Sequence, residues 1–179
     1  MNAYVPAPIA RHLDICITTE QPTQFIDLTD RLNRHVRDLG VQTGLLNVQS
    51  LHTTTAIVVN EHEPLLHGDV TRLLNRVAPC DQGYDHDDLA VRTVNLTADE
   101  RANGHAHCRS MLLASSVCLN VIEGRLRLGR WQRVFLVELD GPRTRDVSVL
   151  VVDQDGGGRR EDGGKDRGPR SWGPVDGRR

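Results

Sequence analysis

Residues 117–152 read VCLNVIEGRLRLGRWQRVFLVELDGPRTRDVSVLVV, and this stretch decides the fold. Its apolar residues fall into four short runs, which are separated by turn residues at Gly124, Gly129 and Gly141. The four runs predict strands over 117–122, 125–128, 133–139 and 145–152. Because strands joined by such short turns pair antiparallel, the sequence predicts a mainly antiparallel sheet.

The residues before this stretch add further strand and helix patterns. Residues 9–19 alternate apolar and polar side chains, as a strand with one solvated face does. Apolar residues three and four positions apart predict helices within 27–40 and 64–79. The remaining predictions are strands over 43–51 and 53–59 and a short helix over 105–114. Helices packed on such a sheet make an α+β fold, and the length predicts one compact domain over residues 1–154.

The last residues, 155–179, differ in composition from the rest of the chain. They hold 8 of the 16 glycines, and their only apolar residues are Trp172 and Val175. So little apolar surface does not offset the entropy lost when a chain is ordered. We therefore expect residues 155–179 to form a disordered tail rich in Gly, Arg and Asp.

Composition and charge exclude several classes of function. The tail carries 7 basic and 5 acidic residues while the whole chain has a net charge of −2, so residues 1–154 are acidic. An acidic domain with 3% aromatic residues is poorly suited to nucleic acid, which is bound by basic side chains and aromatic stacking. No apolar run approaches the roughly 18 residues of a membrane span, and the first nine residues show no signal peptide. The chain has four cysteines and no CxxC pair, so we expect a cytoplasmic protein. From the charge and the apolar runs we expect no nucleic-acid partner and no membrane partner.

Histidine is the residue type that most suggests chemistry, with eight in 179 residues. His52 lies between two predicted strands, and His86 lies in an acidic, irregular stretch. His105 and His107 open the last predicted helix, where they point about 200° apart and cannot easily share one metal. Three imidazoles with one open position form a catalytic type of zinc site. Surface histidines with ordinary hydrogen bonds are the alternative.

Other polar residues at the ends of predicted elements are candidates for a site. Ser115, Ser116 and Arg143 are candidate donors to an anion, although small hydroxyl residues also serve as local caps and turns. Asn60 either faces a pocket or caps a helix. Glu138 interrupts an apolar strand, so its carboxylate is either solvated or held in a site. The chain has no P-loop, no GxGxxG motif and no GxSxG motif.

Seven short motifs follow one another along the chain: HTTTA at 52–56, NE at 60–61, YDHDD at 84–88, NGHAH at 103–107, LLASS at 112–116, GRLRLGRWQ at 124–132 and ELDGPR at 138–143. Together they resemble the YjbQ family, which is named for secondary thiamine-phosphate synthase activity. The resemblance covers about residues 9–152. One departure is Ala114, which stands where the family usually has glycine.

The resemblance implies an α+β fold with a mostly antiparallel sheet, assembled as a homotrimer. It also implies a divalent metal, zinc in known members, held by His52, His86 and His107, and so it selects His107 over His105. A pocket at a subunit boundary is implied as well. The residues that the resemblance places near this pocket are Asn60, Ser115, Ser116, Trp131, Gln132 and Glu138.

The leading hypothesis is a metal-dependent enzyme that acts on a small phosphorylated metabolite. By resemblance, it joins a pyrimidine pyrophosphate to a thiazole phosphate to give thiamine phosphate, and the cation neutralises the departing pyrophosphate. A hydrolase of a phosphorylated or acyl compound is a second hypothesis, because three-histidine zinc sites commonly activate water. A trimeric metal- or metabolite-binding protein without catalysis is the third. For the enzyme we expect catalytic roles for Asn60 and Glu138 and substrate-binding roles for Ser115, Ser116, Trp131, Gln132 and Arg143.

Overall fold

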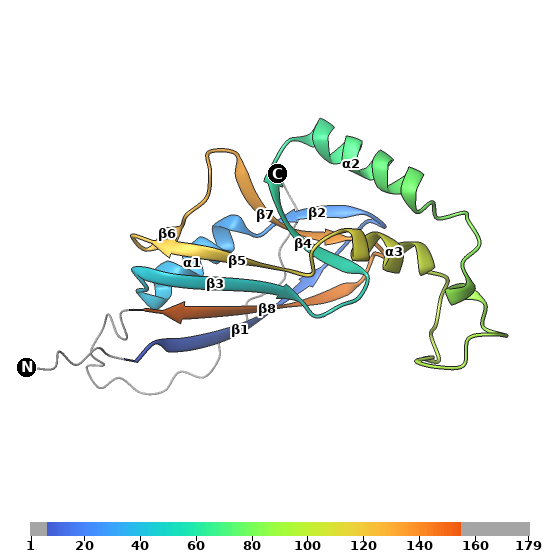
Figure 1. Cartoon of the computed structure of the whole chain (residues 1–179), viewed down its shortest axis with the longest axis horizontal. Coiled ribbons are helices and arrows are strands. Elements are labelled where there is room, and N and C mark those ends of the chain that lie inside the picture. Colours follow the sequence, from blue (N-terminus) through green and yellow to red (C-terminus); the bar gives the residue numbers. More distant parts are fainter. Residues whose placement is uncertain (1–6, 155–179) are drawn as a thin grey trace, which may run out of the picture.

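Antiparallel strands in two sheets form the framework of the computed structural model, which describes residues 7–154 (Figure 1). The strands are β1 (Ile9–Thr18), β2 (Gln24–Asp27), β3 (Thr43–Ser50), β4 (Thr55–Glu61), β5 (Ser116–Ile122), β6 (Arg125–Leu126), β7 (Gln132–Glu138) and β8 (Thr144–Asp153). The helices are α1 (Thr29–Leu39), α2 (Pro64–Val77) and α3 (Gly104–Leu112), with a 3-10 turn, η1, at Asp85–Asp87. The tail predicted over 155–179 lies outside the described residues.

The two sheets differ in size and share no strand. The larger sheet has the strand order β1-β8-β3-β5-β6, and the smaller has the order β2-β7-β4. All strand pairs within them are antiparallel, which confirms the mainly antiparallel α+β fold expected from the sequence. The single predicted sheet is divided in two because β7 and β8 pair with different neighbours, although only a short turn joins them.

The main hydrophobic core lies between the two sheets. β8 contributes Val147, Val149 and Val151, which are buried and alternate with exposed or half-buried residues. This period of two leaves the outer face of the larger sheet in contact with solvent. α1 adds Leu32 and Val36 to the same core.

β7 is buried on both faces, and this explains its unbroken apolar run. Val134 and Leu136 face the main core, whereas Phe135 and Val137 belong to a second cluster that includes Leu74 of α2. α3 contributes to the second cluster as well. α2 and α3 therefore cover the face of the smaller sheet that points away from the larger one (Figure 1).

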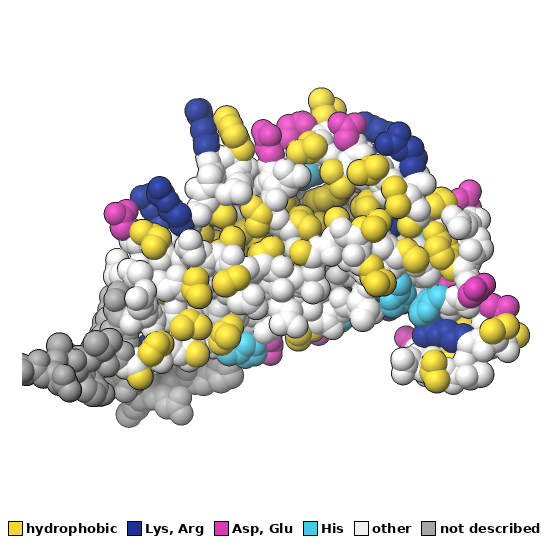
Figure 2. Space-filling view, viewed as in Figure 1, with side chains coloured by type: hydrophobic (Ala, Val, Ile, Leu, Met, Phe, Trp, Pro, Cys, Tyr) yellow, Lys and Arg dark blue, Asp and Glu magenta, His cyan; other side chains and the backbone are white. Residues whose placement is uncertain are grey.

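α2 begins where its sequence predicts a helix start. Pro64 occupies the first turn, and the Glu63 carboxylate accepts hydrogen bonds from the backbone N–H groups of Leu65 at 2.8 Å and Leu66 at 2.7 Å. Only Leu74 of this helix is buried, and apolar side chains remain exposed over α2 and α3 (Figure 2). Neither α2 nor any other helix within residues 7–154 is long and apolar enough to cross a membrane.

Candidate functional site

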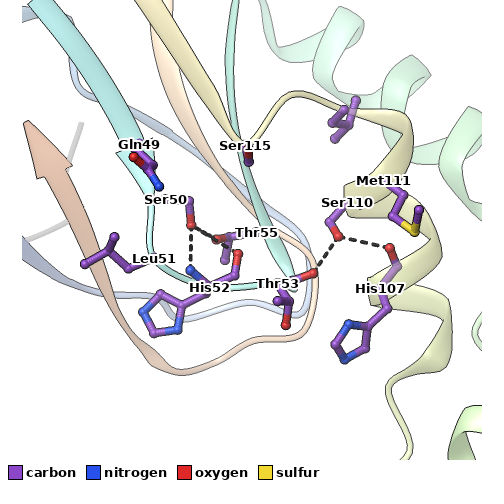
Figure 3. Close-up of a pocket in the computed structure, with 11 residues that line it drawn as sticks. Gln49, Ser50, Leu51, His52, Thr53, Thr55, His107, Ser110, Met111 and Ser115 are labelled. Carbon is purple, nitrogen blue, oxygen red and sulfur yellow. Dashed lines mark hydrogen bonds between the residues drawn. The ribbon is translucent and has the colours of Figure 1, made fainter.

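A pocket of about 640 Å³ opens between α3 and the segment that joins β3 to β4 (Figure 3). One wall, from β3 to the start of β4, consists of Gln49, Ser50, Leu51, His52, Thr53 and Thr55. The other wall, from α3 and the residues after it, consists of His107, Ser110, Met111, Leu113 and Ser115. The rings of His52 and His107 lie on the two sides of the pocket, and hydroxyl side chains make up much of the remaining polar lining (Figure 3).

Hydrogen bonds fix the two walls. Ser110 Oγ donates to the backbone carbonyl of Thr53, so α3 is tied to the segment that carries His52. Within that segment, the Ser50 hydroxyl bonds to the Thr55 hydroxyl and accepts from the backbone N–H of His52 at 3.2 Å. The backbone that carries each pocket histidine is therefore held in place.

The His52 ring is engaged by a backbone amide. The Asp146 N–H donates to His52 Nε2 at 2.8 Å. A ring nitrogen that accepts a hydrogen bond carries no proton, so the proton of the neutral ring is on Nδ1. Burial lowers the pKa of His52, and the positive charge of Arg145 lowers it further, so the ring is neutral near pH 7.

His86 and His107 form a contacting pair. Their ring centroids are 4.5 Å apart, and the ring planes are inclined by 57°. Burial lowers the pKa of His107, and the adjacent His86 ring lowers it further, so the His107 ring is also neutral near pH 7. Arg92 Nη1 lies 3.2 Å from His86 Nε2 and 2.8 Å from a Glu100 carboxylate oxygen. Because a guanidinium only donates, His86 Nε2 accepts in this contact.

The three predicted metal ligands are brought together only in part. His107 shares the pocket with His52 and contacts the ring of His86, but residues 7–154 contain no group of three His, Cys, Asp or Glu side chains that could hold a metal ion. Zinc binds neutral imidazoles, and the lowered pKa of His107 favours the neutral form of its ring. In this arrangement, however, the Nε2 lone pairs of His52 and His86 are engaged by Asp146 and Arg92. The residues as arranged therefore do not fit a three-histidine metal centre.

Glu138 is fully buried and does not line the pocket. Arg145 donates to its two carboxylate oxygens at 2.7 Å and 2.6 Å, and Thr19 Oγ1 donates at 2.9 Å. Arg145 Nη2 also donates to Thr54 Oγ1 at 3.2 Å. Because Thr54 follows closely on His52, the Glu138–Arg145 pair supports the pocket segment from within the core.

Arg143, a predicted anion donor, is paired with the buried carboxylate of Asp140. The distance from Arg143 Nη2 to Asp140 Oδ2 is 3.4 Å. Asp140 Oδ1 lies 3.2 Å from Arg101 Nη2, and Asp140 Oδ2 accepts a hydrogen bond from Asn103 Nδ2 at 3.0 Å. An anion bound by Arg143 would therefore compete with this network.

Asn60, Trp131 and Gln132 lie away from the pocket. Thr55 lines the pocket at the start of β4, whereas Asn60 lies five residues further along, a span of about 17 Å in a strand. Gln132 is in register with Glu61, and Trp131 precedes it with 61% of its surface exposed. Within one chain, these three residues therefore lie apart from the pocket histidines.

The sequence patterns located some of the pocket residues and missed others. Ser115 lines the pocket as expected, whereas Ser116 begins β5 and does not line it. Ser110 was missed, although it lies three positions after His107 and so on the same face of a helix. Arg145 was also missed. Its signal was a charged residue in the inward register of β8, two positions before the buried Val147.

Comparison with known proteins gives the family. Residues 14–154 match the family described as UPF0047 protein YjbQ-like. The chain belongs to the YjbQ-like UPF0047 family. The resemblance drawn from the seven motifs is therefore confirmed at the level of the family.

Relatives within the UPF0047 family match over nearly their full length. A UPF0047 protein of Archaeoglobus fulgidus is 37% identical over 140 residues, which cover 78% of this chain and 100% of that protein. A UPF0047 protein of Methanothermobacter thermautotrophicus is 34% identical over 139 residues, which cover 78% of this chain and 90% of that protein.

Solved structures share the YjbQ-like fold. The crystal structure of a YbjQ-like protein of unknown function from Sulfolobus solfataricus has a TM-score of 0.73 at 30% identity, and the match covers 82% of this chain and 99% of that one. The structure of a hypothetical protein from Aeropyrum pernix has a TM-score of 0.71 at 31% identity, covering 80% and 98%.

Proposed function

We propose that this member of the UPF0047 family is an enzyme acting on a small phosphorylated metabolite, and that the pocket between His52 and His107 is its active site. The observation that carries the proposal is the His107 ring. It faces the pocket, its pKa is lowered, and among residues 7–154 no hydrogen bond engages its nitrogens. A neutral imidazole with an uncommitted nitrogen lone pair is suited either to bind a metal ion or to accept a proton from a bound substrate, and the lone pair serves one of these roles at a time.

The size and lining of the pocket support a small polar ligand. A volume of about 640 Å³ is within the usual range of small-molecule sites. The hydroxyl groups of Thr53 and Ser115 can donate to phosphate oxygens, and Met111 and Leu113 add apolar contact area. This combination suits a ligand with a phosphate group and an apolar ring.

The charge of the pocket supports a cation that accompanies the phosphate. Among residues 7–154, no Lys or Arg lines the pocket, and both of its histidines are neutral near pH 7. A divalent metal, zinc in the first place, therefore remains part of the proposal, and His52, His86 and His107 would ligate it only after a rearrangement, because they do not form its site as arranged. It would supply the positive charge that a phosphate or departing pyrophosphate needs. Such binding requires the rings of His52 and His86 to release Asp146 and Arg92.

The reaction proposed first is the condensation that the family resemblance implies. It joins a pyrimidine pyrophosphate to a thiazole phosphate and releases pyrophosphate. In this proposal Glu138 acts through Arg145 by holding the segment that carries His52, and it does not touch substrate. Asn60, Trp131 and Gln132 can take part only if a neighbouring subunit brings them to the pocket, because they lie at the other end of β4. The proposal therefore includes a homotrimer with the pocket at a subunit boundary.

Purified full-length protein tests the proposal. Its metal content is measured, and its activity is assayed first with the pyrimidine and thiazole substrates and then with a panel of phosphorylated metabolites. We expect His107→Ala to lower kcat/KM about 100-fold or more, since it removes the uncommitted imidazole. We expect His52→Ala, His86→Ala and His107→Ala each to lower the metal content sharply. The metal content should also fall as the pH drops through the imidazole range, because a protonated ring does not bind metal.

His105→Ala is the matched control for His107→Ala. His105 lies on the same helix, its pKa is also lowered by burial, and it does not line the pocket. We expect this variant to keep its metal and most of its activity. A His107→Ala protein that is as active as the wild type would remove the basis of the proposal.

A further inference from the structure

The N-terminus of α3 is capped by a residue from a distant turn. Asp87 Oδ1 accepts hydrogen bonds from the backbone N–H groups of Asn103 at 2.9 Å and Gly104 at 2.8 Å. Asn103, the residue at the cap position of α3, contributes no side-chain cap of its own. The first N–H groups of a helix have no partner within the helix, and a carboxylate there is also favoured by the helix dipole. Asp87 therefore satisfies donors that the helix itself leaves open.

The turn that supplies this cap also carries one of the paired histidines. Asp87 and His86 are adjacent in η1, and His107 lies three residues into α3 from Gly104. The cap therefore joins the two short elements on which the paired rings stand. The 4.5 Å contact between the rings of His86 and His107 spans the same junction.

Close packing beside the cap leaves the junction little freedom. A Cβ on Gly104 would lie 2.6 Å from Tyr84 Cβ, so only glycine lets the turn approach the helix this closely. The Tyr84 hydroxyl donates to the Pro79 carbonyl at 2.9 Å, which anchors the start of the turn. On the other side, Asn103 Nδ2 donates to buried Asp140 at 3.0 Å, which anchors the start of α3 to the body. With both elements anchored, the Asp87 carboxylate is the polar link between them.

We propose that Asp87 is a positioning residue, whose carboxylate caps α3 from η1 and thereby holds His86 against His107. This inference rests on the proposed function in one respect: the proposed function is what gives the His86–His107 pair a role beside the pocket. Asp88 differs, because its Oδ1 accepts from Ala90 N–H at 2.9 Å within the local turn and makes no bond to α3. Loss of Asp87 is therefore expected to separate the rings, whereas loss of Asp88 is not.

The test compares Asp87→Ala, Asp87→Asn and Asp88→Asn in the full chain with ¹³C-labelled histidine. In the wild type we expect a ring-proton NOE between His86 and His107 and a slowly exchanging Gly104 amide. Asp87→Ala should lose the NOE, and its Gly104 amide should exchange about tenfold faster, as the loss of one hydrogen bond predicts. Asp87→Asn should restore the NOE in part, because an amide oxygen still accepts from both N–H groups. Asp88→Asn removes the same charge nearby and should behave as wild type.

A second measurement, the affinity of each variant for inorganic pyrophosphate, shows whether the position of the histidine pair affects ligand binding in the pocket. We expect Asp87→Ala to weaken binding about tenfold, since a displaced group in a preorganised site loses its contacts, while Asp88→Asn stays within about twofold. An NOE that persists in Asp87→Ala overturns the inference, as does a lost NOE with unchanged pyrophosphate affinity. If the wild type does not bind pyrophosphate, the anion part of the proposed function fails and the NOE alone decides the role of Asp87. Should Asp87→Ala not fold, Asp87→Asn decides, and a Gly104 amide that has lost its protection there while the NOE stays as strong as in the wild type overturns the inference.

Discussion

Glu138 is a charged residue with no exposed surface, and its carboxylate is held by two side chains from other segments and by the backbone that follows it. Arg145 and Thr19 donate to it from their side chains, and the Asp140 backbone N–H donates at 2.8 Å. The two positions Glu138 and Arg145 come from the strands on either side of the turn between the two sheets. Their ion pair therefore joins β7 to β8, and through the bond from Arg145 to Thr54 it also holds the segment that carries His52.

Removing the charge of Glu138 should strongly destabilise the protein. In Glu138→Gln the guanidinium of Arg145 stays buried without its anion, and breaking such a pair costs about 3–5 kcal/mol. Urea denaturation at pH 7 and one fixed protein concentration measures the loss. Glu123→Gln is the matched control, because its side chain is 77% exposed and the change should stay within about 0.5 kcal/mol. A Glu138→Gln protein as stable as this control would show that the buried pair is not required for stability.

The same pair should make stability depend on pH in the acid range. Burial opposes ionisation of Glu138, but hydrogen bonds from Arg145 and Asp140 outweigh it, and the pKa of Glu138 lies below its ordinary value. The stability due to this group is therefore complete above the ordinary glutamate pKa of about 4.3 and is lost as the pH falls through the lowered value. The difference in unfolding free energy between wild type and Glu138→Gln should shrink as the pH falls below about 4. A difference that stays constant from pH 7 to pH 3 would contradict the assignment.

At the scale of single residues, the sequence predicted several residues that line the pocket, but it did not predict the contacts between residues that are distant in the sequence. His52 and Ser115 lie in loops beside strand ends, and His107 lies in the first turn of α3. The pattern around Glu138 left its carboxylate open between solvent and a site, and the structure gives it a buried partner in Arg145. Local patterns identify helix caps only from neighbouring residues. The cap from Asp87 could not be found in this way, because its acceptor and the helix that it caps are far apart in the sequence.

The start of α3 allows a direct test at the scale of elements. Gly104→Ala should destabilise the protein by about 1–3 kcal/mol, because the new methyl group would lie 2.6 Å from Tyr84 Cβ and force the turn away from the helix. Alanine favours helices, so propensity alone predicts the opposite sign. Gly68→Ala in α2 is the matched control, since its nearest neighbour is the flexible end of Arg72 at 3.3 Å. We expect this change to be neutral or to stabilise by up to about 1 kcal/mol, as measured by urea denaturation. Equal effects of the two changes would argue against the close contact.

The elements themselves were largely predictable, with differences at short strands and boundaries. Alternation identified β1 and β8, because one face of each meets solvent and the other meets the core. β2 was missed, since its four residues place Phe25 and Ile26 side by side without alternation. The helix predicted to start at residue 105 begins one residue earlier, at Gly104. The division into two sheets depends on which strands pair, and hydrophobic patterns specify faces rather than partners.

At the scale of the whole molecule, the homotrimer expected from the family resemblance stays a prediction. The exposed apolar side chains over α2 and α3, including Leu73, Val77 and Met111, are compatible with further burial in an assembly. Sedimentation of the full chain at micromolar concentration should give three times the mass of one chain. A stable monomer under these conditions would also count against a pocket completed by Trp131 and Gln132 of a neighbouring subunit.

β1 and β8 pair along their whole length, from Ile9 opposite Asp153 to Thr18 opposite Thr144, although they lie at opposite ends of the described chain. β8 also stands between β1 and β3, so until β8 is in place β1 has no neighbour in this sheet and β3 has only β5. During translation, the first strand must therefore leave the ribosome long before the strand that completes its hydrogen bonds. Pairing over such a long separation is slow, and unpaired apolar strands are prone to aggregate in the meantime. The larger sheet can therefore close only after residues 144–153 have emerged, and until then β1 has no strand beside it in this sheet.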